Sequence, residues 1–279
     1  MPVLIAHTIS EATEILAEHP DATILNGGTD LMVEVNFNHR RPSSVLLLRN
    51  VPELREWSIN SSQQTITIGA GVPYAVMESG AIAAAVPALA QAARTVGSPQ
   101  IRAAGTMGGN LGTCSPAGDT LPVLSALEAT IHLSSRDGER TVPFDEFMVG
   151  PKRNSRLAHE IITAVTLPVT GNRQGYSKVG VRNAMVISVA SACFAIVNNT
   201  PRLAMGSVGP TILRAAKAEK FLAEATKDLD NISDEIAREF GQIASTEARP
   251  IDDHRSTAQY RAHAIKVLAS RLALRGTAS

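Results

Sequence analysis

The sequence is poor in aromatic residues and in cysteine, and it carries no excess of charge of either sign. Aromatic residues make up 4% of its 279 positions, so the core must be built from aliphatic side chains. Two cysteines, Cys114 and Cys193, are too few to ligate an iron–sulfur cluster or a structural zinc ion. The 26 basic residues balance the 26 acidic ones, which excludes a general nucleic-acid or anionic-membrane surface.

The sequence also lacks segments that direct a chain into or across a membrane. Its first stretch, Met1–His7, has no basic region and no long apolar run, and a signal peptide needs both. The apolar stretch 81–93 is interrupted by Pro87 and Gln91. The histidines are scattered without metal-ligand spacing, and no nucleophile stands beside a suitable base. We therefore expect a cytoplasmic protein with no membrane span, no metal site and no catalytic residue of its own.

Two glycine pairs dominate what the sequence does contain. The first lies in Leu25-Asn26-Gly27-Gly28-Thr29-Asp30-Leu31, and the second in Thr106-Met107-Gly108-Gly109-Asn110-Leu111-Gly112. Glycine lets the backbone adopt positive φ and brings bare N–H groups close to a ligand. Thr29, Thr106 and Asn110 add hydrogen-bond donors without adding charge. The two segments together predict a dinucleotide site in which backbone groups, rather than Lys or Arg side chains, surround the diphosphate.

Neither glycine pair is decisive alone. A Gly-Gly-Thr segment is most often a tight turn. The first pair is not a P-loop, because no Lys-Ser/Thr follows it, and no Gly-x-Gly-x-x-Gly fingerprint follows a strand. Its position between an expected strand over 22–25 and an expected helix over 30–35 favours an anion site, because a helix start offers N–H groups and partial positive charge.

The remaining patterns predict an α+β protein in two parts, 1–170 and 175–279, with the first part divided into subdomains of about 1–55 and 60–170. In the first part we expect three helices: one over 11–17 capped by Ser10, an alanine-rich one over 81–95 stopped by Gly97-Ser98-Pro99, and one over 121–128. We also expect a buried strand over 45–48, a half-exposed strand over 64–69, a hairpin over 129–142 and a strand over 160–168.

A polar connector, Gly171–Gly175, separates the two parts. Beyond it the patterns predict strands over 186–197 and 202–208, followed by helices over 214–225, 233–240 and 256–274.

Three single residues each allow a structural and a functional interpretation. Asp119 follows the second glycine pair and could hold sugar hydroxyls, but for this residue alone an acid near the start of the next helix is the commoner case. Lys178 could place a cation near a reduced flavin, whereas a solvated surface lysine is the commoner case. Cys114 is more simply a small core residue than a nucleophile.

With these residues taken in order, the sequence resembles the medium, FAD-binding subunits of molybdenum hydroxylases, the xanthine dehydrogenase and carbon monoxide dehydrogenase family. Gly27-Gly28-Thr29-Asp30-Leu31 and Thr106-Met107-Gly108-Gly109-Asn110 resemble the two pyrophosphate loops of that family. Ser115-Pro116-Ala117-Gly118-Asp119 resembles its small-residue run ending in a flavin-binding Asp, and the stretch Tyr176–Met185 resembles the opening of its C-terminal domain. The resemblance covers nearly the whole chain.

The resemblance implies an FAD-binding fold of the vanillyl-alcohol-oxidase type, followed by a smaller α+β domain that covers one side of the flavin. FAD would bind non-covalently. Its implied contacts, in chain order, are Ile24, Leu25, Asn26, Gly27, Gly28, Thr29, Asp30 and Leu31 along the diphosphate, Val96 at the adenine, Thr106, Gly109 and Asn110 on the other side of the diphosphate, Asp119 at ribose or ribityl hydroxyls, and Ile162 and Lys178 beside the isoalloxazine or adenine.

The implied activity is electron relay within a complex. An iron–sulfur subunit would carry 2Fe-2S centres, a large subunit would carry molybdopterin, and the assembly would be a dimer of heterotrimers. Electrons would pass onto this chain's FAD and then to NAD or another acceptor. Two other interpretations stay open: a self-contained FAD-dependent oxidase or reductase of the same superfold, and a nucleotide-binding or scaffold module without flavin.

Overall fold

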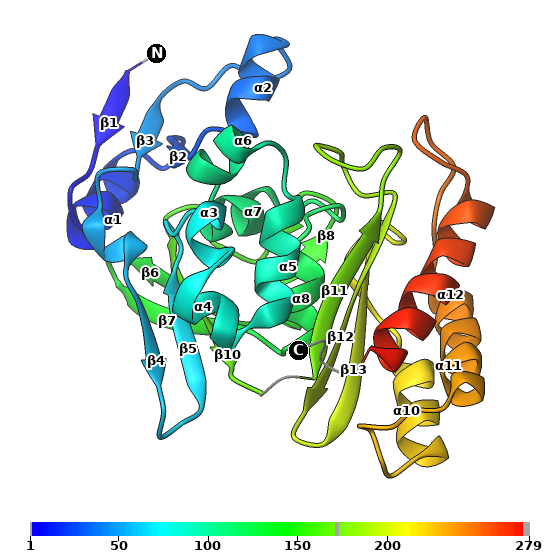
Figure 1. Ribbon diagram of the computed structural model, residues 1–279. Coiled ribbons are helices and arrows are strands. Elements are labelled where there is room, and N and C mark those ends of the chain that lie inside the picture. The colour runs from blue at the N-terminus through cyan, green and yellow to red at the C-terminus, as the bar shows by residue number, and fades with distance from the viewer. Residues whose placement is uncertain (1, 171–172, 276–279) are drawn as a thin grey trace.

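The computed structural model describes residues 2–170 and 173–275, and Figure 1 shows them as three units side by side. An N-terminal unit holds a small parallel sheet, and a central unit holds an antiparallel sheet with short helices. A C-terminal unit holds a second antiparallel sheet backed by longer helices. Clusters of buried, mostly aliphatic side chains form the cores. The class is α+β, as the sequence predicted.

The N-terminal unit is a parallel sheet in the order β1–β3–β2. Its elements are β1 (Val3–Ile5), α1 (Ile9–Glu18), β2 (Thr23–Leu25), α2 (Leu31–Asn36) and β3 (Val45–Leu47). The central position of β3 explains its unbroken apolar sequence. The prediction of Ser10 as the cap of α1 is wrong. Thr8 has the extended backbone of an N-cap, and its hydroxyl accepts a hydrogen bond from the Glu11 N–H.

The central sheet has the order β4–β5–β10–β6–β7, and its neighbouring strands are antiparallel. The strands are β4 (Trp57–Asn60), β5 (Thr65–Gly69), β6 (Thr130–Ser135), β7 (Gly138–Pro143) and β10 (Ile161–Pro168). The predicted half-exposed strand is confirmed, because Ile66 and Ile68 are buried while Thr65 and Thr67 are partly exposed. The predicted hairpin is confirmed as the pair β6–β7.

Short helices cover one face of the central sheet (Figure 1). The expected single helix over 81–95 is wrong: α4 (Gly80–Ala85) and α5 (Pro87–Thr95) meet at Val86, whose backbone is non-helical. Proline disfavours a helical conformation at the residue before it, so Pro87 ends one helix and starts the next. The predicted stop at Gly97-Ser98-Pro99 also begins a helix that the sequence patterns missed, α6 (Pro99–Ala104), in which the Ser98 hydroxyl caps the Ile101 N–H.

Smaller elements complete the central unit. They are η1 (Pro52–Arg55), α3 (Tyr74–Met77), α7 (Met107–Thr113), α8 (Leu121–Ala126), α9 (Phe144–Phe147), β8 (Met148–Gly150) and β9 (Arg153–Asn154).

The C-terminal sheet has the order β11–β12–β13–β14. Its strands are β11 (Gln174–Val179), β12 (Ala190–Val197), β13 (Thr200–Gly206) and β14 (Leu213–Arg214), followed by α10 (Ala216–Ala225), α11 (Asp234–Glu247) and α12 (Ala258–Leu274). Of the predicted connector, Gly171 and Asn172 lie outside the described residues, and Gln174 already belongs to β11.

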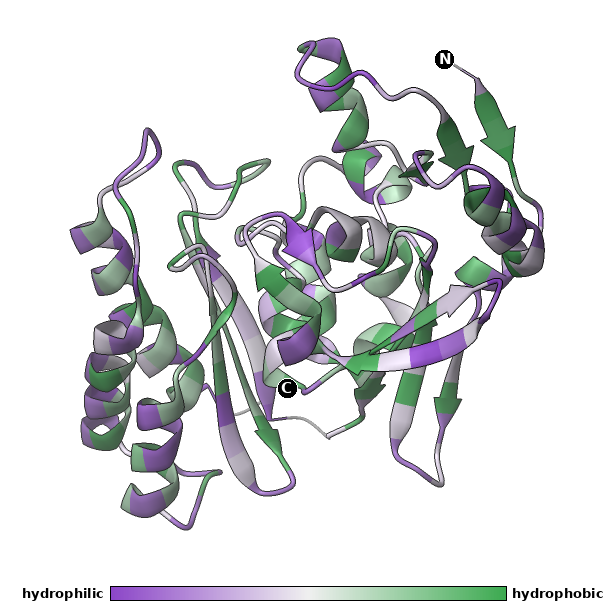
Figure 2. Ribbon diagram, turned by 180° about the vertical axis from the view of Figure 1, so that it is seen from behind, coloured by the Kyte–Doolittle hydropathy of each residue, from purple (hydrophilic) through white to green (hydrophobic). Residues whose placement is uncertain are grey.

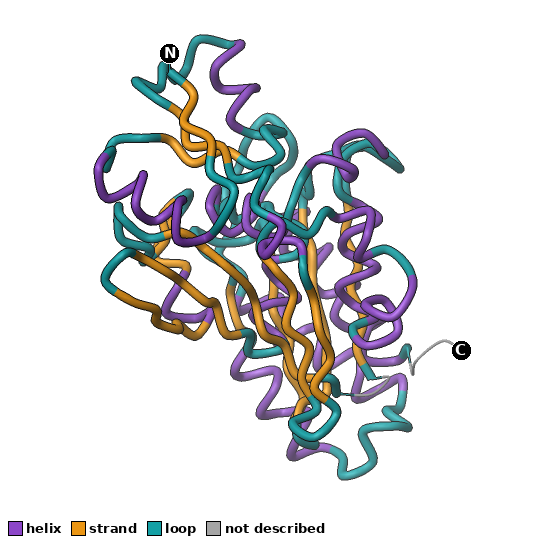
Figure 3. The backbone as a smooth tube through the Cα atoms, turned by 90° about the vertical axis from the view of Figure 1, so that its left-hand side faces the viewer, coloured by secondary structure: helices purple, strands orange, loops and turns teal. Residues whose placement is uncertain are grey.

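The C-terminal sheet lies between two layers of helices. One face packs against α5 and α8 of the central unit, and α10 and α12 cover the other face (Figure 1). Hydrophilic and hydrophobic residues alternate along the outer helices, as Figure 2 shows. The N-terminal unit sits beyond one end of the central sheet (Figure 3). Among the described helices, none combines the length and the apolar character needed to cross a membrane.

Candidate cofactor-binding site

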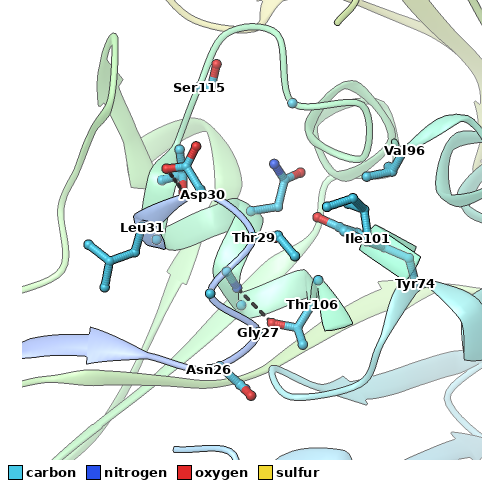
Figure 4. A pocket seen from close by; sticks show the side chains of 18 of the residues that line it. Asn26, Gly27, Thr29, Asp30, Leu31, Tyr74, Val96, Ile101, Thr106 and Ser115 are labelled. Atoms are coloured by element: carbon cyan, nitrogen blue, oxygen red, sulfur yellow. Dashed lines mark hydrogen bonds between the residues drawn. The ribbon is translucent and has the colours of Figure 1, made fainter. Parts of the chain in front are cut away.

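A cavity of about 660 Å³ lies where the three units meet. All of the binding residues predicted from the sequence, with the exception of Lys178, line this cavity. They are Ile24, Leu25, Asn26, Gly27, Gly28, Thr29, Asp30, Leu31, Val96, Thr106, Gly109, Asn110, Asp119 and Ile162. Figure 4 shows the first glycine segment passing beside Thr106, with Val96, Ile101 and Tyr74 on the opposite side from Leu31.

The first glycine segment presents a row of backbone donors to the cavity. None of the five consecutive N–H groups from Gly27 to Leu31 donates a hydrogen bond to any acceptor in the described part of the chain. Buried backbone N–H groups are nearly always paired, so such a row is typical of an anion-binding site. The predicted strand and helix on either side are present as β2 and α2, and they hold the segment at both ends.

The second glycine segment differs from its prediction. It is the first turn of helix α7, and its N–H groups are already paired: Gly108 N donates to Ala70 O at 2.8 Å, and Gly109 N donates to Thr106 Oγ1 at 3.1 Å. The sequence interpretation of this segment as a source of bare N–H groups is therefore wrong. Thr106 is an N-cap, a role that its position before a run of helical residues explains. Only side chains of this segment, such as that of Asn110, are placed to donate.

Gly27 and Gly28 are required for different structural reasons, and Gly112 differs from both. A Cβ atom on Gly27 would lie 1.9 Å from Ala104 O, so glycine allows the first segment to touch helix α6. Gly28 has φ of +71°, which only glycine adopts at little cost. Gly112 lines the cavity, and a Cβ atom there would meet no atom within 4 Å.

Asp119 lines the cavity, and two side chains of strand β11 hold its carboxylate in place. Lys178 Nζ donates to Asp119 Oδ2 at 2.7 Å, and Tyr176 Oη donates to Asp119 Oδ1 at 2.8 Å. Burial raises the pKa of Asp119, while Lys178 and Tyr176 act in the opposite direction. A hydrogen bond with Thr95 acts in the same direction as Lys178 and Tyr176, and the carboxylate still has acceptor capacity for a ligand hydroxyl.

Lys178 lies behind this carboxylate and not in the cavity wall. Its ammonium group also donates to Thr95 O at 2.9 Å and to Val186 O at 3.0 Å, so all three of its protons have acceptors. The interpretation of Lys178 as a solvated surface lysine is wrong, and its placement near a flavin stays a prediction. The side chain is 8% exposed, and a single sequence carries no signal for such a buried pair.

Several cavity residues were not predicted. Tyr74, Ile101 and the loop residues Met185, Val186 and Ile187 add apolar surface. The missed helix α6 carries Ile101, and the Ser98-Pro99 cap signal could have revealed it.

A charged cluster on the side of α2 was also missed. Lys152 Nζ lies 2.8 Å from Glu34 Oε1, and Arg40 Nη1 lies 3.9 Å from Glu34 Oε2. All three residues line the cavity together with Arg156, so basic side chains do border it, contrary to the expectation of a purely backbone site.

Thiol and metal chemistry have no geometric support in the site. Cys114 is buried at the end of α7, and burial raises the pKa of its thiol to about 12, so the thiol stays protonated at neutral pH. The structural interpretation of Cys114 is therefore the better one. Over the described ranges, no three His, Cys, Asp or Glu side chains converge as a metal site would require.

The sequence matches two family models in succession. Residues 1–170 match the FAD binding domain in molybdopterin dehydrogenase, and residues 176–275 match the CO dehydrogenase flavoprotein C-terminal domain.

Similar proteins of nearly the same length accompany these matches. The glyceraldehyde dehydrogenase medium chain of Sulfolobus acidocaldarius is 31% identical over 94% of this chain and 93% of its own. The nicotinate dehydrogenase FAD-subunit of Eubacterium barkeri is 33% identical over 81% of this chain and 80% of its own. Quinoline 2-oxidoreductase of Pseudomonas putida 86 shares the fold, with a TM-score of 0.91, 24% identity and coverage of 99% of this chain and 96% of that one.

The two family models together cover nearly the whole chain, and the relatives match it over most of their own length, so the family of the chain is clear. The protein belongs to the FAD-binding medium subunits of the molybdopterin hydroxylases, the oxidoreductase family of xanthine dehydrogenase and carbon monoxide dehydrogenase.

Proposed function

We propose that this chain relays electrons through a non-covalently bound FAD, accepting them from iron–sulfur centres of a partner subunit and passing them to NAD or another acceptor. The observation that carries the proposal is the row of unpaired N–H groups from Gly27 to Leu31 along the cavity wall. These groups fit a diphosphate, because several neighbouring donors can bind one anion, and the Asp30 carboxylate in the same row is engaged by Thr113 Oγ1 at 3.1 Å. The open space at Gly112 leaves room for the ligand beside them.

The proposed placement of FAD follows from the donors that remain available. The diphosphate lies along residues 24–31, with Asn110 and the segment around Thr106 and Gly109 opposite. Asp119 accepts from ribose or ribityl hydroxyls, and Val96 and Ile162 contact the rings. Lys178 acts through Asp119, since its own donors are occupied. When bound, FAD supplies the electron and hydride chemistry, and the chain supplies position and electrostatics.

The make-up of the cavity wall supports the proposal of non-covalent attachment. Among its lining residues in the described part of the chain there is neither a histidine nor a cysteine. A covalent flavin linkage through histidine or cysteine therefore has no attachment point among these residues. We therefore expect FAD to be released when the protein is denatured.

We also propose the finer domain division. Residues 1–170 would form a vanillyl-alcohol-oxidase-type FAD-binding domain, with subdomains of about 1–55 and 60–170, and residues 175–279 would form the C-terminal domain. The three-stranded sheet and the five-stranded sheet support the subdomains, because each lies within one of them. Asp119 and Lys178 then join the two domains at the cofactor site.

The proposed assembly is cytoplasmic and contains two further kinds of subunit. An iron–sulfur subunit carries the 2Fe-2S centres, a large subunit carries molybdopterin, and two such heterotrimers form a dimer. The relatives named as a medium chain and as an FAD-subunit support this division of labour. The organic substrate is then oxidised on the large subunit, and this chain contributes the flavin.

The test compares the isolated, FAD-loaded chain with the complex expressed from the neighbouring genes. We expect the isolated chain to accept electrons from dithionite but not to oxidise aldehydes, purines or N-heteroaromatic compounds, and we expect the complex to oxidise one of them. Turnover of an organic substrate by the isolated chain at roughly 1 s⁻¹ or faster would overturn the proposal in favour of a self-contained flavoenzyme.

A further inference from the structure

Arg261 is a buried cation outside the cavity, and two of its three hydrogen-bond partners belong to segments that connect to the cavity wall. The residue lies near the start of α12 and is 3% exposed. Its Nη1 atom donates to Val189 O at 2.7 Å and to Ser207 O at 2.9 Å, and its Nη2 atom donates to Asp253 Oδ1 at 2.6 Å. A buried guanidinium placed on two carbonyl groups fixes the distance between the segments that carry them.

The first contact holds the loop 180–188, which connects β11 to β12 (Figure 1). Val189 closes the base of this loop, because its N–H donates to Val179 O at 2.8 Å. Within the loop, Met185, Val186 and Ile187 form part of the cavity wall. Lys178 holds the same loop at Val186 O. Two buried cations, Lys178 and Arg261, therefore donate hydrogen bonds to backbone carbonyl groups in and next to this loop.

The second contact connects Arg261 to a different segment of the wall. Ser207, whose carbonyl accepts from Arg261, donates through its own N–H to Pro116 O at 2.8 Å. Pro116 belongs to the segment 115–119, in which Ser115, Ala117, Gly118 and Asp119 line the cavity. One guanidinium group thus links two wall segments that are far apart in sequence.

The third contact keeps the cation in place. Asp253 Oδ1 also accepts from Arg255 N at 2.8 Å and from Ser256 N at 3.2 Å, so the carboxylate is fixed by its own turn. Arg255 pairs with the other oxygen of Asp253 at 3.7 Å, but neither wall segment accepts a hydrogen bond from it. The two arginines therefore share one carboxylate and differ in their contact with the cavity wall.

We propose that Arg261 is a positioning residue of the cofactor site, which sets how closely the loop 180–188 and the segment 115–119 enclose the bound cofactor. The inference rests on the proposed function, because it takes FAD as the ligand. Arg261 itself touches no cavity atom and acts only through Val189 and through Ser207 and Pro116.

The experiment measures FAD binding and iodide quenching of the bound flavin in the full chain, for wild type, Arg261→Met, Arg261→Lys and Arg255→Met. In Arg261→Met we expect the dissociation constant of FAD to rise roughly tenfold, because charge-assisted hydrogen bonds to both walls are lost. The iodide quenching constant should also rise. Lysine keeps the charge but not the planar fork, so Arg261→Lys should fall between wild type and Arg261→Met.

The matched control separates positioning from general stability. Arg255→Met removes the other cation on Asp253 and should leave both measurements within about twofold of wild type. Equal values for Arg261→Met and Arg255→Met would overturn the inference while leaving FAD binding intact. If Arg261→Met fails to fold, wild-type values in Arg261→Lys would overturn it. A wild-type chain that binds no FAD would overturn the proposed function, and this inference with it.

Discussion

Lys178 Nζ lies 2.7 Å from Asp119 Oδ2, and this buried ion pair joins strand β11 to the wall of the cofactor cavity. Both side chains are 8% exposed, so neither charge is well solvated without the other. The pair explains how an acidic residue can lie close to an expected diphosphate, because the ammonium group of Lys178 already neutralises the negative charge of Asp119. Asp119 can then offer its remaining lone pairs to uncharged hydroxyl groups of the ligand.

Removing the lysine alone should be costly. Lys178→Met leaves the Asp119 carboxylate buried and unpaired, so we expect the free energy of unfolding to fall by about 3 kcal/mol. The double variant Lys178→Met/Asp119→Asn should recover most of this loss, because it removes the stranded charge. Urea unfolding of both variants checks the prediction, with exposed Lys220→Met as the control for loss of a lysine. A double variant no more stable than Lys178→Met would contradict it.

A side chain at Gly112 should block the cofactor without unfolding the protein. Gly112 lies in helix α7 and lines the cavity, and a Cβ atom there would meet no atom within 4 Å. Gly112→Leu should therefore abolish FAD retention. The melting temperature of the FAD-free protein should stay the same or rise, because leucine is the better helix former by several tenths of a kcal/mol. Full retention of FAD in Gly112→Leu would show that the cavity is not the binding site.

Substitutions at Gly28, which has a left-handed backbone, should show how much of the loss of stability comes from backbone strain. Gly28→Ala places a Cβ atom at φ of +71° and 3.3 Å from Leu25 Cδ1, so we expect a loss of about 1–2 kcal/mol in the free energy of unfolding. Asparagine tolerates this conformation better, so Gly28→Asn should lose less. Both variants disturb the row of N–H groups and should bind FAD more weakly than wild type. Equal destabilisation by the two substitutions would mean that backbone strain is not the cause.

Features of the fold and of the site that depend on neighbouring residues in the sequence could be predicted, and features that depend on distant residues could not. Apolar periodicity located β3, β5 and β10, and the two glycine segments identified the part of the cavity wall formed by residues 24–31 and by the first turn of α7. Caps and breaks were harder: Pro87 divided a helix whose alanine pattern runs straight through it, and Pro99 began a helix where only a stop was predicted. The pairing of Asp119 with Lys178 could not be predicted, because it depends on how the C-terminal sheet docks on α5.

The ion pair between Glu160 and Arg140 should make stability depend on acid pH. Arg140 donates to the 5%-exposed carboxylate of Glu160 and holds its pKa below the ordinary value of 4.5. The unfolded chain therefore takes up a proton first, so this contribution is complete above pH 4.5 and is lost as pH falls through the lower pKa of the folded protein. Glu160→Gln should be less stable than wild type at neutral pH, and the gap should narrow below pH 4.5. The measurement is urea unfolding of both proteins across this range, and a gap independent of pH would contradict the prediction.

The most direct test of the account is the identity and attachment of the ligand in the purified full chain. The protein is precipitated with acid, and the supernatant and pellet are analysed for flavin by chromatography and absorbance. The account predicts one FAD per chain, all of it in the supernatant. FMN in place of FAD, flavin retained by the washed pellet, or a chain that neither contains nor takes up FAD would contradict the claim that Gly27–Leu31 binds the diphosphate of a non-covalent FAD.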